Sequence, residues 1–499
     1  MIGSKFVPHS IETAGKTSTR SRSWLVAATC AVLSVASLPS AMADVKLPSI
    51  FSDNMALQQG VPLKVWGWAD EGEDVTVTIG SNSATTKAAG GSWKVELPAI
   101  EKFGPTTFKV AGKNTIEPKN VIVADVWVCS GQSNMEWTVS RSMNPKEEIA
   151  AAKYPGIRVF MVPKVAANQP QKDINAKWIE VSPETISNVT AVGYYFGRDL
   201  HQKLDRPVGL INDAWGGTLC EAWTSAEALA ADADYADILK RGEAANNDEK
   251  QKNGPNRPSV LYNGMIAPIV PFSIKGAIWY QGESNAGRAE QYRKLLPTMI
   301  ADWRKQWGQG DFPFYVVQLA NYLAKTPEPV ESAWAELREA QWLTGKNVPN
   351  AGTAIIIDIG EEKDIHPQNK QDVGKRLALL ALKNTYGKDV PSQGPVYKSM
   401  TVEGNKIRLA FDHVHGGLKV AGDELRSFAV CGEDKKWAWA KASIDGDTVV
   451  LVVPDSITKP VAVRYAWANN PDATLFNAAG LPAVPFRTDN FPGATTGKK

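Results

Sequence analysis

The sequence predicts an α/β fold in which a parallel sheet is covered by helices on both faces and flanked by two β-rich segments. Between residues 121 and 395, continuous apolar runs rich in β-branched residues alternate with stretches of helical periodicity. Residues 44–120 and 396–488 instead contain short strand-like runs separated by turn residues, with no helical period. Uninterrupted apolar strands that alternate with helices are typical of a parallel sheet buried on both sides.

The composition is that of a globular protein with more than one domain. The chain has 499 residues, more than a single hydrophobic core usually accommodates. Its formal net charge of +2 gives no reason to expect nucleic acid or an acidic membrane surface as a partner. The 17 tryptophans predict large aromatic cores, and a few of them are candidate platforms for stacking on sugars.

Residues 1–43 have the pattern of a secretory signal peptide. Basic residues precede an apolar run over residues 24–38, and "AMA" at 41–43 supplies a small-x-small cleavage pattern. The apolar run is too short to cross a bilayer as a stable helix. We therefore expect the mature chain to begin at Asp44 and to be exported to the periplasm or the extracellular space, without stable membrane association.

The two flanking segments are expected to form β structure. In residues 44–120, the predicted strands of a small antiparallel domain are "PLKVWGWA", "EDVTVTIG", "SWKVELP" and "TTFKVAG". In residues 396–488 they are "KIRLAFDH", "SFAVCG", "KWAWAKASI", "DTVVLVVP" and "PVAVRYAWA". Residues 489–499 read as a polar tail. The sequence leaves open whether the two β segments pack against each other.

The middle segment, residues 121–395, carries the parallel sheet. Its predicted strands are "VIVADVWV", "IRVFMV", "VGLINDA", "KGAIWYQ", "FPFYVVQLA" and "TAIIIDIG", and its clearest helices are "AVGYYFGRDLHQKL" and "QDVGKRLALLALKNTYG". Ligands of such folds bind at the carboxyl ends of the strands. The residues that follow each strand are therefore the place to look for chemistry.

Ser133 is the candidate nucleophile. It lies in "CSGQSNMEW", directly after the first strand of the middle segment. A serine hydroxyl reacts only when a base removes its proton, and histidine is the usual base. The serine is flanked by Gln132 and Asn134, which we expect to bind substrate or to orient the loop.

His366 is the candidate base, with Asp364 as the group that orients it. Both lie in "DIHP", after the strand "TAIIIDI" and before a long helix, on the same predicted edge of the sheet as Ser133. A carboxylate two residues away can accept the imidazole Nδ1 proton while the other ring nitrogen faces the serine. His413 and His415 form an H-x-H pair on an expected strand, but no carboxylate or cysteine cluster accompanies them, so we expect no metal site.

Two further strand ends offer donors for an oxyanion. The Ser133 backbone N–H is one donor, and the pair Gly216–Gly217 in "WGGTLCEAW" offers another unhindered backbone N–H. In "YQGESN", Gln281 and Asn285 offer side-chain amides.

Two other classes of function compete with a serine hydrolase. Glu136, Glu221 and Glu283 lie near the same strand ends, and paired carboxylates could make a glycoside hydrolase. Glu221 and Glu283 are also well placed to orient loops by accepting hydrogen bonds. A non-catalytic carbohydrate-binding protein would fit the β segments and the many tryptophans, but it would have no need for the Ser–Asp–His set.

The expected mature chain has an odd number of cysteines: Cys129, Cys220 and Cys431. At least one thiol is therefore free or pairs with another chain. A bridge between Cys129 and Cys220 and a pair of buried free thiols both remain open.

Taken together, these motifs resemble the sialate O-acetylesterase-like branch of the SGNH (GDSL-type) hydrolases. The resemblance covers nearly the whole expected mature chain. It rests on "LPSIFSDNMALQQGVPLKVWGWADEGEDVTVTI", "VWVCSGQSNMEW", "WGGTLCEAW", "LYNGMIAPI", "WYQGESNA", "DIHPQNKQDVGKRLA" and "VRYAWANNPDATLFNAAGLPAVPFRTD".

The resemblance implies a flavodoxin-like three-layer α/β/α sandwich with β-rich flanking domains and no metal or organic cofactor. It places the nucleophile on Ser133 and the acid and base on Asp364 and His366. The glycine of the oxyanion hole falls on Gly217, and the amide donor on Gln281, with Asn285 as the alternative. The implied substrate is an O-acetylated carbohydrate, such as a sialic acid or a xylan or xyloglucan fragment.

Overall fold

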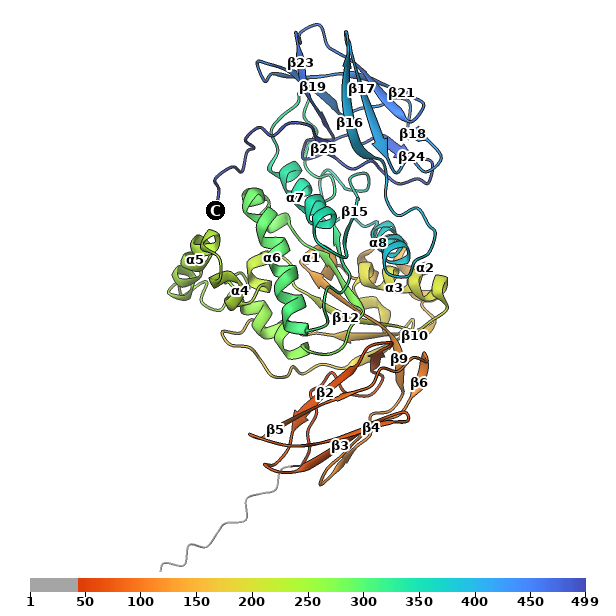
Figure 1. Cartoon of the computed structure of the whole chain (residues 1–499), viewed down its shortest axis with the longest axis vertical. Helices are drawn as coiled ribbons and strands as arrows, with labels where there is room; N and C mark the ends of the chain where they lie inside the picture. The colour runs from red at the N-terminus through yellow and green to blue at the C-terminus, as the bar shows by residue number, and fades with distance from the viewer. Residues whose placement is uncertain (1–43) are drawn as a thin grey trace, which may run out of the picture. The chain divides into compact units, whose positions relative to one another are not determined.

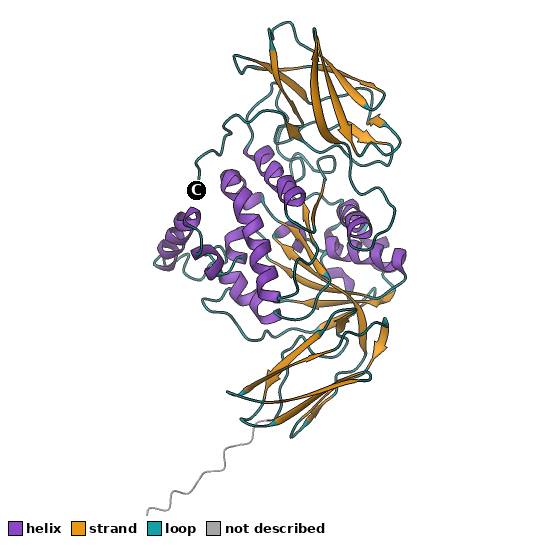
Figure 2. Cartoon of the chain, in the orientation of Figure 1, coloured by secondary structure: helices purple, strands orange, loops and turns teal. Residues whose placement is uncertain are grey.

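The computed structural model describes residues 44–499, so the predicted signal peptide lies outside the described residues. Within the described chain, every α-helix falls between residues 133 and 384, and the segments before and after contain strands and loops (Figure 2). The three regions of the predicted fold class, a helix-covered sheet between two β-rich segments, are thus confirmed. No helix of the described residues is long and apolar enough to cross a membrane.

The central sheet is mostly parallel. From one edge to the other its strands are β11 (Trp178–Val181), β10 (Tyr154–Met161), β12 (Val208–Ala214), β9 (Val121–Gly131), β13 (Gly276–Tyr280), β14 (Phe314–Val317) and β15 (Ala351–Ala354). Every neighbouring pair is parallel except the edge pair β10–β11. Strand β9 lies in the middle and is buried along its whole length, as its unbroken apolar sequence predicts.

Helices cover both faces of this sheet (Figure 1). On β9 the Cys129 side chain lies against Gly193 of α3 (Ala191–Leu204). The next residue along, Ser130, is level with Trp279 of β13, whose ring packs against Trp303 of α6 (Ala289–Trp307). Successive side chains of a strand point to opposite faces, so α3 and α6 lie on opposite sides of the sheet.

The remaining helices are α1 (Ser133–Glu136), α2 (Pro145–Ala151), α4 (Ala226–Ala230), α5 (Ala236–Asn246), α7 (Ala333–Asn347) and α8 (Lys370–Asn384). Helix α8 packs beside α3, and α7 beside α6. The charged stretch after Trp223 contains the short helices α4 and α5.

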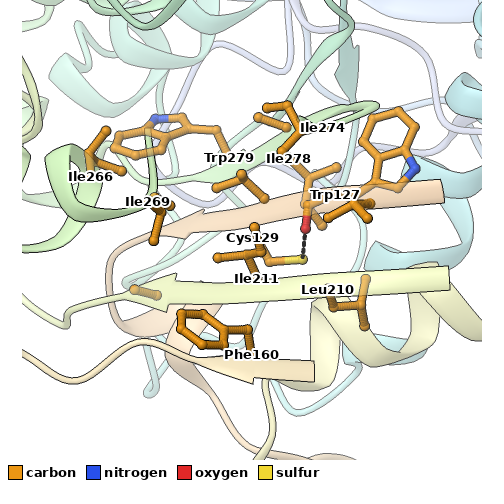
Figure 3. Packing of buried hydrophobic residues seen from close by; sticks show 14 of the residues in the cluster. Trp127, Cys129, Phe160, Leu210, Ile211, Ile266, Ile269, Ile274, Ile278 and Trp279 are labelled. Carbon is orange, nitrogen blue, oxygen red and sulfur yellow. Dashed lines mark hydrogen bonds between the residues drawn. The ribbon is translucent and has the colours of Figure 1, made fainter. Parts of the chain in front are cut away.

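The core around β9 is tightly apolar. Figure 3 shows Cys129 among Trp127, Ile211 and Ile278, with its S–H directed to the backbone oxygen of Trp127. Cys129, Cys220 and Cys431 are all buried and free, so the open alternative of a Cys129–Cys220 bridge is not what the structure shows. Burial raises the pKa of the Cys129 thiol far above its ordinary value, which makes it an inert packing residue.

The strands before β9 form two small sheets. One pairs β2 (Leu63–Trp68) with β5 (Ser92–Leu97), and the other has the order β4 (Asn82–Lys87), β3 (Asp74–Ile79), β7 (Phe108–Ala111) and β8 (Thr115–Ile116). Strands β1 (Ala56–Gln58) and β6 (Gly104–Thr106) instead pair with the first half of β9. The long strand β9 therefore joins the first β segment to the central sheet.

The strands after α8 form a second set of sheets with a hydrophobic cluster of their own. One sheet has the order β16 (Val396–Glu403), β17 (Lys406–Asp412), β22 (Thr448–Val452) and β21 (Lys441–Asp445). Another has the order β20 (Trp437–Trp439), β19 (Phe428–Gly432), β23 (Pro460–Tyr465) and β25 (Phe486–Arg487). A third pairs β18 (Leu418–Val420) with β24 (Leu475–Asn477). No strand of this set pairs with a strand of residues 44–120 in the described chain.

Three local expectations were wrong. The strand expected over "TAIIIDIG" ends at Ala354, because Ile355 and Ile357 turn into the hydrophobic cluster of the last segment. His413 and His415 lie in the turn after β17, with φ of 59° and 40°, and not on a strand.

The expected polar tail is the third. It docks onto the middle segment, where Thr495 is fully buried and its backbone N–H and hydroxyl donate to Glu336 of α7.

Candidate active site

Ser133 begins a one-turn helix at the carboxyl end of β9. Gly131, the last residue of β9, has φ +139°, and a Cβ there would lie 2.1 Å from the Tyr280 carbonyl oxygen. Only glycine permits this close turn, which brings the serine out of the buried strand. The N–H of Ser133 has no hydrogen-bond acceptor among the described residues, because it lies in the first turn of the helix.

The structure brings Ser133, His366 and Asp364 together, although Ser133 lies 233 residues before His366. His366 Nε2 is 2.9 Å from Ser133 Oγ. Asp364 Oδ1 is 3.2 Å from His366 Nδ1 and also accepts the backbone N–H of His366 at 2.9 Å. This is the nucleophile–base–orienter geometry that acyl transfer requires.

Trp137 and Arg141 support the histidine from one side. The Trp137 ring stacks on the His366 ring, with centroids 5.0 Å apart and an interplanar angle of 15°. The Arg141 guanidinium lies 3.6 Å from the centroid of the same indole. Burial lowers the pKa of His366 below its ordinary value, partly offset by Asp364, while the positive charges of Lys370 and Arg141 lower it further.

The Gly216–Gly217 turn follows β12 and lies beside Ser133. The Gly216 N–H donates to Glu136 Oε2 at 2.7 Å, which fixes the turn against α1. The Gly217 N–H has no acceptor among the described residues, and the space beside Gly217, at φ +75°, is open. Gly217, rather than Gly216, is therefore the glycine free to donate to an oxyanion.

We expect Gly216→Ala to lower kcat about tenfold to a hundredfold, because a displacement of a fraction of an ångström beside the nucleophile disturbs its alignment. A Cβ at this position would lie 3.1 Å from both Ser133 Cβ and Glu136 Oε2. Gly287→Ala is the matched control, since a Cβ there meets nothing within 4 Å. Equal kcat values for the two variants would show that the turn does not press on Ser133.

Gln281 and Asn285 do not fill the role of amide donor that the sequence suggested. Both are buried, and the Gln281 amide donates to Thr218 O at 3.0 Å and to Asn285 Oδ1 at 2.6 Å. Asn285 in turn donates to Glu221 Oε2 at 2.8 Å and accepts the Cys220 N–H. Because these amides are used inside the protein, they hold the turn that follows Gly217 and do not reach an oxyanion.

The other expected site residues orient loops. Gln132 Oε1 lies within 3.4 Å of the backbone N–H groups of Gly282 and Ser284. Asn134 donates to Glu283 Oε1 at 2.7 Å and to the carbonyl of Ile365 at 3.0 Å. The residues on either side of the nucleophile thus tie its loop to two neighbouring loops.

The carboxylates of the glycoside hydrolase alternative are occupied. Glu221 is 2% exposed and accepts from Asn285 and from Arg288 at 2.6 Å. Glu283 accepts from Asn134, and Glu136 accepts from Gly216 and pairs with Lys164 at 2.5 Å. Each of the three carboxylates already accepts a hydrogen bond within the protein, so the structure does not favour this alternative.

Sequence reasoning missed Trp137 and Lys370. Trp137 lies in the quoted motif "GQSNMEW", but nothing in a single sequence shows that its ring reaches His366. Lys370 follows "DIHPQN" at the start of α8 and is fully buried beside Asn134. A lysine in the first turn of a helix is usually a solvated residue, so its burial could not be anticipated.

The fold and this site define a class of protein, the carboxylic ester hydrolases. A family described as "carbohydrate esterase, sialic acid-specific acetylesterase" matches residues 123–383, and the chain belongs to this family.

Similar proteins are known both by sequence and by structure. Sialate O-acetylesterase from Homo sapiens is 31% identical over 500 residues, an alignment that covers 90% of this chain and 94% of the human protein. The Mus musculus protein of the same name is 30% identical over 507 residues, covering 87% and 93%. The crystal structure of a carbohydrate acetylesterase from Xanthomonas citri has a TM-score of 0.82 at 39% identity, covering 90% of this chain and all of that one.

Proposed function

We propose that this protein is a serine esterase that removes O-acetyl groups from carbohydrates. The observation that carries the proposal is the 2.9 Å contact between His366 Nε2 and Ser133 Oγ, with Asp364 behind the imidazole, in a chain of a carbohydrate esterase family. The intact set also weighs against a non-catalytic carbohydrate-binding protein, which would not need it.

In the first half of the reaction, Ser133 Oγ attacks the acetyl carbonyl carbon while His366 Nε2 takes the hydroxyl proton. Asp364 accepts a hydrogen bond from the Nδ1–H group and so holds the ring in the tautomer whose Nε2 is a base. The free N–H groups of Ser133 and Gly217 bind the oxyanion. His366 then gives its proton to the sugar oxygen as that oxygen leaves.

In the second half, a water molecule gives a proton to His366 and attacks the acetyl-serine. Collapse of the second oxyanion breaks the ester bond to Ser133 Oγ, which takes the proton back from His366. Acetate and a free sugar hydroxyl are the products. No step uses a metal or an organic cofactor.

The pH dependence follows from the lowered pKa of His366. The base must be neutral, and a lowered pKa keeps it neutral to a more acidic pH, so activity is retained further into acid. We expect the acid limb of kcat/KM to have its midpoint below the ordinary histidine value of about 6.5. A profile on an aryl acetate measures this midpoint, and a value above 6.5 would contradict the environment described for His366.

The substrate class is tested by assaying acetate and new reducing ends in parallel. Acetylated sialic acid, xylan oligosaccharides and xyloglucan oligosaccharides are compared by kcat/KM. We expect acetate release from at least one of them, without new reducing ends. Reducing ends without acetate would support the glycoside hydrolase alternative, and sugar binding without either product would support a binding protein.

We also propose that the protein is exported and that residues 1–43 are removed. The support is the basic, apolar and small-residue order of that segment. Mass spectrometry of the protein secreted by its native host is expected to give Asp44 as the first residue. Recovery of the uncleaved chain from the cytoplasm would contradict the proposal.

A further inference from the structure

We propose that Lys370, acting with Glu283 through the side chain of Asn134, is a positioning residue that sets the place and the charge environment of His366. These three residues are called the Asn134 cluster below. The inference rests on the proposed function, because it concerns the base of that reaction.

Asn134 joins the loop of the nucleophile to the loop of the base. Its amide nitrogen uses one hydrogen for Glu283 Oε1 at 2.7 Å and the other for the carbonyl of Ile365 at 3.0 Å. Ile365 is the residue before His366. The amide oxygen accepts from Lys370 Nζ at 2.5 Å. An anion at the nitrogen end and a cation at the oxygen end fix the amide in one orientation.

This orientation has a direct geometric consequence. Asn134 follows Ser133, so one rigid amide links the residue after the nucleophile to the residue before the base. Hydrogen bonds to charged groups are stronger than those between neutral groups, and buried ones hold geometry best. The cluster therefore constrains the approach of His366 to Ser133 through the residues next to each of them in the chain.

Stability alone does not explain Lys370. Its side chain is fully buried. The Lys370 Nζ lies 5.4 Å from the centroid of the Tyr280 ring and 5.7 Å from the centroid of the Trp137 ring. It also lies in the first turn of α8, where the helix dipole disfavours a positive charge. Burial lowers the pKa of Lys370 to about 7, although the negative charges of Glu283, Glu361 and Asp364 raise it.

The second charge of the cluster is also costly to bury. Glu283 Oε2 is buried and has no hydrogen-bond partner among residues 44–499, and burial raises the pKa of this carboxyl. Replacing buried charges with apolar residues of similar volume is often neutral or stabilising. A costly buried cation beside the base is better explained by what it does to that base.

The charged groups that face His366 are Asp364, Lys370 and Arg141, and the ring that faces it is Trp137. Asp364 favours the protonated imidazole, whereas the two cations disfavour it. Loss of the Lys370 charge is therefore expected to raise the pKa of His366 and to shift the acid limb of kcat/KM upward.

The test compares Lys370→Met with wild type and with Lys305→Met, an exposed lysine of α6 that pairs with Glu227. Each variant is assayed on an aryl acetate across pH, and the His366 imidazole is titrated by NMR. For Lys370→Met we expect kcat to fall about tenfold to a hundredfold with little change in KM. We also expect the His366 titration midpoint to move up relative to wild type, because a positive charge near the imidazole is lost. Lys305→Met should match wild type.

A second variant separates positioning from folding. Lys370→Met leaves the Glu283 carboxyl without its cation, so the double variant Glu283→Gln/Lys370→Met removes both charges. We expect the double variant to regain the thermal stability of wild type but to keep the low kcat and the raised His366 titration. Recovery of kcat together with stability would show that the cluster is only structural.

The outcome for the cluster is distinguishable from the outcome for the proposed function. Wild-type kcat and an unmoved His366 titration in Lys370→Met would overturn the inference while leaving the esterase intact. If wild type releases no acetate and a serine-directed phosphonate does not label Ser133, the proposed function falls. The NMR titration needs no turnover, so it still decides whether Lys370 acts on His366.

Discussion

Ser133→Ala is expected to lower kcat on an aryl acetate about a hundred-thousand-fold, with the fold intact. The hydroxyl that His366 faces at 2.9 Å supplies the bond-forming atom of the reaction, and a methyl group cannot replace it. The residual activity comes from direct attack by water on the bound substrate, helped only by the oxyanion donors and by substrate binding. No buried hydrogen bond other than the one to His366 involves the Ser133 hydroxyl among the described residues, so folding should be little affected.

His366→Ala should cost about as much as Ser133→Ala, and the double variant little more than either. Nucleophile and base act as one unit, so their effects do not add. Stopped assays of all three variants, with thermal unfolding as the check on folding, measure this. Ser443→Ala, on the exposed face of β21, is the matched control. Additive losses, or a Ser133→Ala enzyme that keeps more than about one hundredth of wild-type kcat, would refute the assigned roles.

The sequence was informative where the chemistry is local in the chain. The apolar run of β9 and the motif "DIHP" each place a functional group directly after an expected strand or before an expected helix. The carboxyl ends of parallel strands meet at one edge, so the topology predicted that Ser133 and His366 lie close together, although β15 ends at Ala354, before the loop that carries His366. The glycine turn after β12 was found for the same reason.

The sequence did not predict the contacts of side chains that can reach several different partners. The amides of Gln281 and Asn285 could reach an oxyanion or the loops around them, and the contact with Thr218 could not be foreseen. Ile355 and Ile357 read as a strand, but a second hydrophobic cluster competes for them. Lys370 shows the same limit, because residue type predicts exposure and only the packed structure shows the burial.

Arg338 of α7 joins the last β segment to the loop that follows β14. This arginine is fully buried and donates to the backbone carbonyls of Leu319, Ala320, Ala468 and Asn469 at 2.6–2.9 Å. Burial lowers its pKa to about 9. The adjacent Asn321 bonds both Asn470 and the N–H of Gly360, where the loop that leads to His366 begins.

Arg338→Met is expected to destabilise the protein by about 4 kcal/mol, because four carbonyls each lose a donor. The Ala320 and Asn469 oxygens keep a second donor, from Trp334 Nε1 and the Tyr322 N–H, whereas the Leu319 and Ala468 oxygens keep none among the described residues. The methionine removes the cost of burying a guanidinium charge, but it cannot donate a hydrogen bond to any of these oxygens. The free energy lost with the hydrogen bonds is therefore larger than the desolvation cost that is removed. Arg338→Lys should recover only part of it, as one ammonium cannot reach acceptors arranged around a planar guanidinium. Urea unfolding measures the change, with Arg426→Met as control for an exposed arginine whose ion pairs contribute little.

Equal unfolding midpoints for Arg338→Met and Arg426→Met would show that the last segment does not depend on Arg338. If Arg338→Met also lowers kcat at temperatures where it is fully folded, the hydrogen bonds of Asn321 to Asn470 and Gly360 transmit the change to the loop of His366.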